Sequence, residues 1–484
     1  MLFSTMTFIY IFLPALCLTY FLVRKDLRNF VLLLASFIFY AWGEPTYLII
    51  MILTILTNYV GALLIDKFVN HKKLCLLLTI AVNLGFLIYF KYFNFLIENI
   101  NALFRTNIDF INVIMPIGIS FYTFQAMSYI IDVYREKVQP QKNLYKLALY
   151  ISLFPQLVAG PVVRYGDIIP QIENREHSFD KVVMGVQRFV IGLSKKVLIA
   201  NTLGEIADKV FMQQPDTFSH LTAWLGVSSY MLQIYYDFSG YSDMAIGLGM
   251  IFGFRFMENF NHPYYAKSMT DAWHKWHISV SNWFKDYVFV LKWNKLVPDF
   301  VYKFDILNKM TKGKYKFKKS YVNVIATFFL IGLWHGASWS FALWGLWHGF
   351  FIIFENMTGW TKQIDTKMTT LLKHIYVPLV ALLGFVLFRS ENIPYAMDYY
   401  KNMFGVLDIH DIKYTMSYYL DNQQIIVFVI AFFCCAPIFA KTLETSKNNK
   451  FFRFALNSWL LILFVLSTAA IASSTYNPFI YFRF

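Results

Sequence analysis

The chain has 484 residues, of which 57% are apolar and 20% aromatic, and only 15% carry a charge. This leaves too little polar surface to cover a soluble globule, so the composition predicts an all-α protein that spans a membrane several times. A net charge of +14 is often a sign of nucleic-acid binding. Here the basic residues alternate with apolar stretches, so we expect no nucleic-acid partner.

Apolar stretches recur along the whole sequence. We expect about ten to twelve spans with short loops, some of them short or re-entrant. Pro116 with Gly118, and Gly160 with Pro161, are expected to break two of the apolar segments. One membrane domain is therefore predicted over residues 1–484, and its clearest spans are 6–23, 29–42, 74–90 and 455–471.

The basic residues predict the orientation. Arg24, Lys25 and Arg28 follow the first predicted span, whereas the next turn has no basic residue. Cytoplasmic loops carry the excess of Lys and Arg, so the N-terminus is expected outside the cytoplasm. The same rule predicts a basic cytoplasmic loop at 292–320, against anionic lipid, and an extracytoplasmic C-terminal tail at 474–484.

One apolar stretch, residues 235–250, contains unusual polar residues. Asp237, Ser239 and Asp243 all lie within it. Ionisable groups at membrane depth are costly and by default indicate a functional site. Two interpretations stay open: these residues line a cavity, or they form an internal hydrogen-bond network that holds helices together.

Four histidines occur in apolar strings rich in tryptophan, at His274, His277, His335 and His348. Asp271 is expected to cap a helix that carries the first two on one face, three residues apart. Their shared apolar, tryptophan-rich setting makes all four candidates for one buried site.

Three interpretations of these histidines were compared. A metal site is disfavoured, because His274 and His277 have no Cys, Asp or Glu at a familiar ligand spacing. Each histidine taken singly is compatible with an ordinary core residue. An imidazole with a pKa of about 6.5 is also a suitable general base near neutrality, and burial would keep it uncharged. The residues alone do not choose among the four.

Five segments resemble the membrane-bound O-acyltransferase family, in this order and over nearly the whole chain. They are PIGISFYTFQ from Pro116, FPQLVAGP from Phe154, YDFSGYSDMA from Tyr236, WHKWHIS from Trp273 and GLWHGA from Gly332. They are most similar to the branch that O-acetylates alginate and peptidoglycan. The resemblance implies a ring of tilted transmembrane and re-entrant helices around a central funnel or tunnel.

The resemblance also implies roles for individual residues. His335 matches the essential histidine of the family and His277 the second one, so both are expected to be catalytic. The other candidates are assigned to the substrate tunnel or its support: His274, Trp276, Trp334, Asp237, Asp243 and Ser239, with His348 as a supporting or structural residue.

The C-terminal tail adds a further hypothesis. Its last residues, PFIYFRF, resemble the terminal motif of the small membrane partner in teichoic-acid D-alanylation, in which the tyrosine is thought to carry the acyl group. Here that residue is Tyr481, whose phenol has a pKa of about 10 and would form an activated ester. The alternative is that Phe479, Tyr481 and Phe484 form an aromatic anchor at the membrane interface.

The resemblance implies an O-acyltransferase of the bacterial inner membrane. We expect it to move an acetyl group from acetyl-CoA or an acyl-carrier thioester, with no bound cofactor, towards a cell-wall polymer or exopolysaccharide. The resemblance also implies a separate extracytoplasmic acetyltransferase as partner, and the chain itself has no G-x-S-x-G motif. The alternatives are a D-alanyl transferase for teichoic acid and a proton-coupled transporter or flippase of a lipid-linked sugar, which inverted repeats would favour.

Overall fold

The computed structural model describes residues 1–291, 293–295, 318–360, 366–409, 412–438, 449–474 and 476–480. Helices and turns make up this described part, which contains no β-strand, so the all-α prediction is confirmed. The chain forms two compact units, which are described one at a time. The first is Met1–Ser194, Gly240–Glu258 and Asn457–Arg483, and the second is Lys195–Ser239, Asn259–Leu456 and Phe484.

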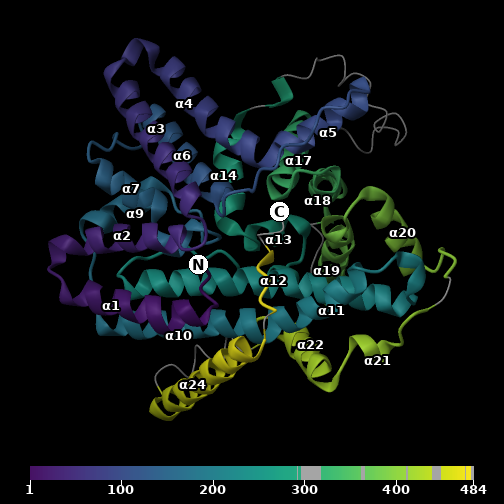
Figure 1. Cartoon of the computed structure of the whole chain (residues 1–484). Helices are drawn as coiled ribbons and strands as arrows, with labels where there is room; N and C mark the ends of the chain where they lie inside the picture. Colours follow the sequence, from purple (N-terminus) through teal and green to yellow (C-terminus); the bar gives the residue numbers. More distant parts are fainter. Residues whose placement is uncertain are drawn as a thin grey trace. The chain divides into compact units, whose positions relative to one another are not determined.

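The first unit contains the N-terminal helices. Among them, α3, α4 and α6 pack against one another (Figure 1). A buried hydrogen bond of 2.9 Å from Asn58 Nδ2 to Asn83 Oδ1 joins α3 to α4, as polar side chains commonly do between membrane helices. The helices are α1 (Leu13–Leu22), α2 (Arg28–Ala41), α3 (Leu48–Lys67), α4 (Lys72–Leu87), α5 (Phe93–Phe104), α6 (Ile119–Tyr134), α7 (Leu144–Ser152), α8 (Phe154–Leu157), α9 (Tyr165–Glu173), α10 (Phe179–Ser194) and most of α24 (Lys450–Ser473).

The two predicted breaks in the apolar segments are confirmed. Helix α6 begins directly after Gly118, whose φ of +76° is a left-handed conformation that glycine adopts without strain. A Cβ at Gly118 would also lie 2.9 Å from the carbonyl oxygen of Leu157, so the close approach needs glycine as well. Helix α8 ends at Leu157, ahead of Gly160 and Pro161.

The second unit is built around the hairpin of α17 (Lys319–His335) and α18 (Trp339–Thr358). The two helices can approach closely because Gly345 has no side chain. A Cβ there would lie only 2.1 Å from the Phe328 carbonyl oxygen. Its other helices are α11 (Asn201–Phe211), the first part of α12 (His220–Ile251), α13 (Met269–Lys275), α14 (Ile278–Tyr287), α19 (Lys367–Arg389), α20 (Ile393–Met403), α21 (Met416–Tyr419) and α22 (Asn422–Cys434).

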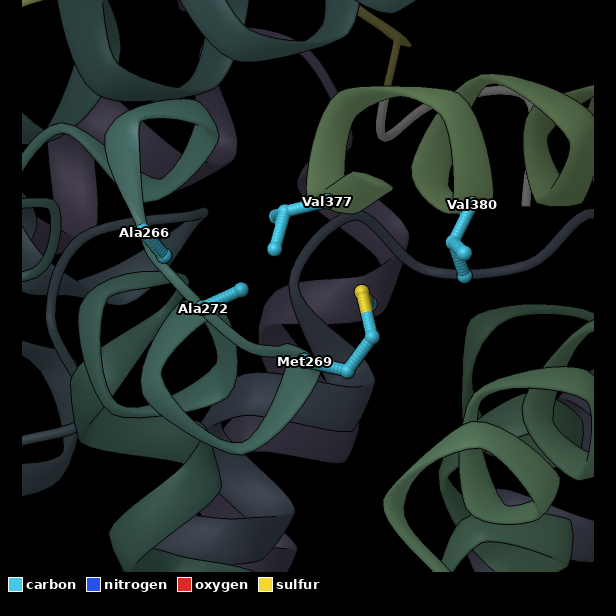
Figure 2. Close-up of a cluster of buried hydrophobic side chains, with 5 residues drawn as sticks. All are labelled: Ala266, Met269, Ala272, Val377 and Val380. Atoms are coloured by element: carbon cyan, nitrogen blue, oxygen red, sulfur yellow. The ribbon is translucent and has the colours of Figure 1, made fainter. Parts of the chain in front are cut away.

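Short helix α13 is packed into the second unit by an apolar cluster. Met269 and Ala272 on α13 meet Val377 and Val380 on α19, together with Ala266 (Figure 2). All five side chains are buried. Burying such side chains stabilises the position of α13 by about 1.5–3 kcal/mol for each large apolar group.

Four helical segments of the described part are long and apolar enough to cross a membrane: Pro45–Lys67, Val69–Phe104, Lys367–Arg389 and Lys450–Ser473. The predicted spans 74–90 and 455–471 fall within two of them, whereas 6–23 and 29–42 correspond to shorter helices. The larger number of spans and the single domain over 1–484 stay predictions. The basic stretch 292–320 lies largely outside the described residues.

Candidate active site

The second unit brings together three of the four predicted histidines. His335 is the last residue of α17, His277 precedes α14, and His348 lies on α18; all three are buried. The Trp334 ring is in contact with the first two, with ring centroids 4.7 Å from His335 and 5.8 Å from His277. The two histidines expected to be catalytic therefore share one tryptophan neighbour.

The cluster continues from His335 to His348 through aromatic rings. The His335 centroid lies 5.0 Å from that of Trp344 and 5.2 Å from that of Phe388. Trp344 in turn lies 4.9 Å from His348. These edge-on ring contacts enclose the imidazoles in apolar surface, where a neutral imidazole is favoured over a charged one.

His277 lies outside the four helices that are long enough to span a membrane. Burial lowers the pKa of its imidazole well below the usual range, and nearby His335 lowers that pKa further. The ring is therefore neutral at pH 7, as a general base or a hydrogen-bond acceptor must be.

The predicted helix carrying His274 and His277 on one face is wrong. Helix α13 ends at Lys275, and His277 has a left-handed backbone with φ 44° and ψ 51°, which starts the separate helix α14. The cap of α13 is Ser268, whose Oγ accepts from the Asp271 N–H at 3.0 Å, and not Asp271. His274 is exposed on α13, whereas His277 is buried.

Asn259 holds the unusual backbone at His277. Its Oδ1 accepts hydrogen bonds from the Ser279 backbone N–H at 3.1 Å and the Ser279 hydroxyl at 2.9 Å, and lies 3.2 Å from His277 Nδ1. Its carbonyl oxygen also accepts from the Ile278 N–H at 2.9 Å. A left-handed non-glycine residue costs about 1–3 kcal/mol and persists where its surroundings fix it.

This contact also assigns the tautomer of His277. The Ser279 N–H can only donate, so the atom that it meets is the amide oxygen of Asn259. That oxygen can only accept, so His277 Nδ1 carries the proton and Nε2 carries the lone pair in the neutral ring. His277 Nε2 therefore accepts hydrogen bonds. No spacing in the sequence points to Asn259.

Trp276 lies beside the histidine cluster, next to a small cavity. The cavity has a volume of about 30 Å³ and is lined by Trp276, Trp273, Trp344, His348 and further apolar residues. Such a space holds one water molecule and is too small for a thioester donor. Both ring nitrogens of His348 are buried with no hydrogen-bond partner among the described residues, as fits a packing role.

Asp237 forms a buried ion pair. Its Oδ1 lies 2.8 Å from Lys196 Nζ, and both side chains are at most 3% exposed. Lys196 also donates to Asn201 Oδ1 at 2.8 Å. Of the two interpretations of the 235–250 stretch, this geometry favours the internal network for Asp237, and Lys196 is a member of it that the sequence did not indicate.

We expect Asp237→Asn to destabilise the protein strongly, because it leaves the Lys196 ammonium buried without its counter-charge. Breaking a buried pair in this way costs about 3–5 kcal/mol. The double variant Asp237→Leu/Lys196→Met, which removes both charges, should be closer to the wild type. Thermal unfolding of detergent-solubilised protein measures both, and equal losses in the single and double variants would contradict the ion-pair role.

The other two polar candidates of the stretch have different surroundings. In the first unit, Arg188 Nε donates to Asp243 Oδ1 at 2.7 Å, and Arg188 Nη1 donates to Glu258 Oε1 at 2.9 Å. Ser239, in the second unit, is buried and its hydroxyl has no hydrogen-bond partner among the described residues. Asp243 is thus part of an ion-pair cluster, whereas Ser239 stays a predicted tunnel residue.

Glu355 is a further site-supporting residue that the sequence did not indicate. It lies buried on α18 and accepts hydrogen bonds from the backbone N–H groups of Met269 and Thr270, and from the Thr270 hydroxyl at 2.9 Å. A carboxylate at the first turn of α13 accepts hydrogen bonds from the backbone N–H groups that have no partner within the helix. Glu355 thereby fixes α13, which leads into His277.

We expect Glu355→Ala to lower the melting temperature more than Glu355→Gln does. The alanine variant leaves buried backbone donors without an acceptor, at about 1–3 kcal/mol for each donor. The glutamine variant keeps one acceptor oxygen and should retain part of that stability. Melting curves in detergent decide the order, and a fully stable Glu355→Ala protein would contradict this role.

Tyr481 lies outside the described residues, but the tail that leads to it is described. Phe479 and Ile480 are buried, and the Phe479 ring lies 4.8 Å from that of Tyr241 in the same unit. Asn477 Nδ2 donates to the Ser4 carbonyl oxygen at 2.8 Å. Phe479 is packed inside the protein, which disfavours it as part of an aromatic anchor at the membrane interface, whereas Tyr481 and Phe484 lie outside the described residues.

The described helices and the buried histidines define an integral membrane protein with an imidazole site. The profile of the MBOAT, membrane-bound O-acyltransferase, family matches residues 139–398, a range that contains His277, His335 and His348. The chain belongs to this family, and it is a membrane-bound O-acyltransferase.

Relatives in bacteria are similar over most or all of the chain. It is 37% identical to the "Probable alginate O-acetylase AlgI" of Pseudomonas putida, with 100% of both chains covered. It is 31% identical to the peptidoglycan O-acetyltransferase of Helicobacter pylori over 84% of this chain and 80% of the relative. The teichoic acid D-alanyltransferase of Bacillus subtilis is 28% identical, over 58% of this chain and 70% of the relative.

Proposed function

We propose that this protein transfers an acetyl group from a cytoplasmic thioester, acetyl-CoA or an acyl carrier, for the O-acetylation of an extracytoplasmic polysaccharide. The observation that carries the proposal is the buried pair of imidazoles, His277 and His335, both in ring contact with Trp334. Full-length similarity to an alginate O-acetylase supports acetyl as the acyl group. Partial similarity to a D-alanyltransferase makes D-alanyl transfer the alternative.

The proposed chemistry uses His335 as the general base. A ring nitrogen of neutral His335 takes the proton of the attacking hydroxyl, whose oxygen forms a bond to the thioester carbonyl carbon. The carbon–sulfur bond then breaks, and the imidazolium returns its proton to the leaving thiolate. His277 accepts a hydrogen bond through Nε2 and so orients the hydroxyl, since its Nδ1 proton is directed at Asn259. Stabilisation of an oxyanion by His277 would instead require a hydrogen-bond donor at Nε2.

The first attacking hydroxyl in this proposal is the phenol of Tyr481. The acetyl group then rests on the tail as a phenyl ester, from which a sugar hydroxyl can take it, because a phenolate is a better leaving group than an alkoxide. The buried packing of Phe479 and Ile480 supports a tail that is held against protein. In this scheme both termini face outside the bacterial inner membrane, and a separate extracytoplasmic acetyltransferase completes the transfer to the polymer.

The test is mass spectrometry of the C-terminal peptide after incubation of purified protein with isotopically labelled acetyl-CoA. We expect a labelled acetyl adduct in the wild type and its loss in both His335→Ala and Tyr481→Phe. An adduct that persists in Tyr481→Phe would contradict the relay through the tail. The complete absence of transfer from acetyl-CoA and from acetylated carrier would contradict acetyl as the acyl group and favour D-alanyl transfer.

A further inference from the structure

The first unit has an open cleft that is unrelated to the histidine cluster. Its volume is about 1280 Å³, and it is lined by Lys25, the start of α2, the end of α9, residues 174–178, Lys181 on α10, and Gly253 and Arg255 after α12. Five basic residues line it, namely Lys25, Arg28, Arg175, Lys181 and Arg255, against two acidic ones, Glu173 and Glu176. The cleft therefore carries a local excess of positive charge.

The two acidic residues do little to offset this charge. Glu173 is paired with Lys146 at 2.6 Å, a residue outside the lining. Glu176 is highly exposed and lies 3.9 Å from Lys181. Exposed ion pairs are weak, so these two carboxylates offset little of the positive charge in the cleft.

Arg28 and Arg175 are the centre of the cleft. Both guanidinium groups lie over the Tyr20 ring, at 5.2 and 5.7 Å from its centroid. Arg175 donates to neutral acceptors, Tyr20 Oη at 3.0 Å and Asn29 Oδ1 at 2.5 Å. Neither arginine has a carboxylate partner among the described residues, and Arg28 Nε is buried without any hydrogen-bond partner there. Two guanidinium groups held together on one ring without a counter-ion are arranged for an anion.

His177 also lines the cleft and is influenced by the same positive charges. Its Nδ1 is 3.5 Å from Arg28 Nη1, and its Nε2 is 2.8 Å from the Tyr20 hydroxyl. Burial lowers the pKa of His177, and the charges of Arg28, Arg175 and Lys181 lower that pKa further. An anion in the cleft would reduce the repulsion among the positive charges of Arg28, Arg175 and Lys181.

The start of α10 adds a second source of positive potential. Ser178 and Lys181, at the first turn of this 16-residue helix, both line the cleft. The free N–H groups and the dipole at a helix N-terminus favour a bound anion, and phosphate groups in particular.

We propose that this cleft is a binding site for a phosphate group, held by Arg28 and Arg175 at the N-terminal end of α10. Lys25 and Arg28 belong to the loop that is expected to face the cytoplasm, so an anionic phospholipid headgroup and a soluble phosphate ester are the two possible sources of the ligand. The site does not depend on the proposed acetyl transfer.

The experiment compares two probes on the full-length protein in lipid nanodiscs. In the first arm, inorganic pyrophosphate is titrated calorimetrically into protein held in phosphatidylcholine. In the second, native mass spectrometry measures the phosphatidylglycerol retained from mixed phosphatidylglycerol and phosphatidylcholine. We expect binding in at least one arm, weakened about tenfold or more in Arg175→Gln and in Arg28→Gln. Binding in the first arm alone identifies a soluble phosphate, and binding in the second alone identifies the lipid.

Arg24→Gln is the matched control. Arg24 lies four residues before Arg28, is exposed, pairs with Asp26 and does not line the cleft. Arg24→Gln removes one positive charge, as Arg28→Gln does. If Arg175→Gln fails to fold, Arg28→Gln still tests the site, because Arg28 makes fewer hydrogen bonds than Arg175. No binding of either probe, or equal weakening by Arg24→Gln, overturns the proposal.

Discussion

His335→Ala should reduce acyl transfer by about 10²- to 10⁴-fold, the range that loss of a general base produces. His335 is buried at the end of α17, with its ring between Trp334, Trp344 and Phe388. Removing it takes away the nitrogen that accepts the proton of the attacking hydroxyl, and water has little access to replace it. The measurement is the initial rate of labelled acetyl transfer, together with the ester content of the polysaccharide from complemented cells.

His348→Ala is the matched control for that variant. His348 is equally buried in the same ring cluster and contacts the same Trp344, so its truncation leaves a similar cavity. We expect it to lower stability as much as His335→Ala but to retain activity within about tenfold of the wild type. Comparable losses of activity in the two variants would mean that packing, and not proton transfer, explains the effect of His335→Ala.

Local features of the sequence predicted the class of fold and the breaks in it. The break before α6 could be predicted because it depends on one residue, Gly118, whose left-handed backbone favours glycine. The apolar stretches at 74–90 and 455–471 could be recognised as spans from their own composition. His335 was predicted in the same way, through the resemblance of a short string, and its catalytic role stays a prediction. Such signals do not depend on what packs against them.

Contacts between distant residues were not predictable. Glu355 caps a helix 86 positions earlier in the chain, and Asn259 holds a histidine 18 positions later. The strings around His274 and His277 have helical spacing, so a continuous helix was the natural expectation. Tertiary contacts from Asn259 overrode that local preference and turned the backbone at His277 left-handed.

Asn259→Leu should lower the transfer rate by about 10²-fold or more, because it removes the acceptor that fixes the Nδ1–H tautomer of His277. The leucine keeps the branched shape of the side chain, but the Ser279 N–H and hydroxyl also lose their acceptor, so a loss of stability is expected too. Activity must therefore be compared at equal amounts of folded protein. A rate unchanged by this variant would contradict the positioning role of Asn259.

Asn259→Asp separates positioning from mere support. The carboxylate keeps an acceptor for His277 Nδ1 and for both Ser279 donors, so we expect activity within about tenfold of the wild type. A negative charge beside the ring also favours the imidazolium, which raises the pKa of His277 from its lowered value. His277 acts in its neutral form, so the acid limb of the pH–rate profile should move to higher pH in Asn259→Asp. If His277 took no part in proton handling and Asn259 only braced the backbone, the variant would keep the wild-type profile.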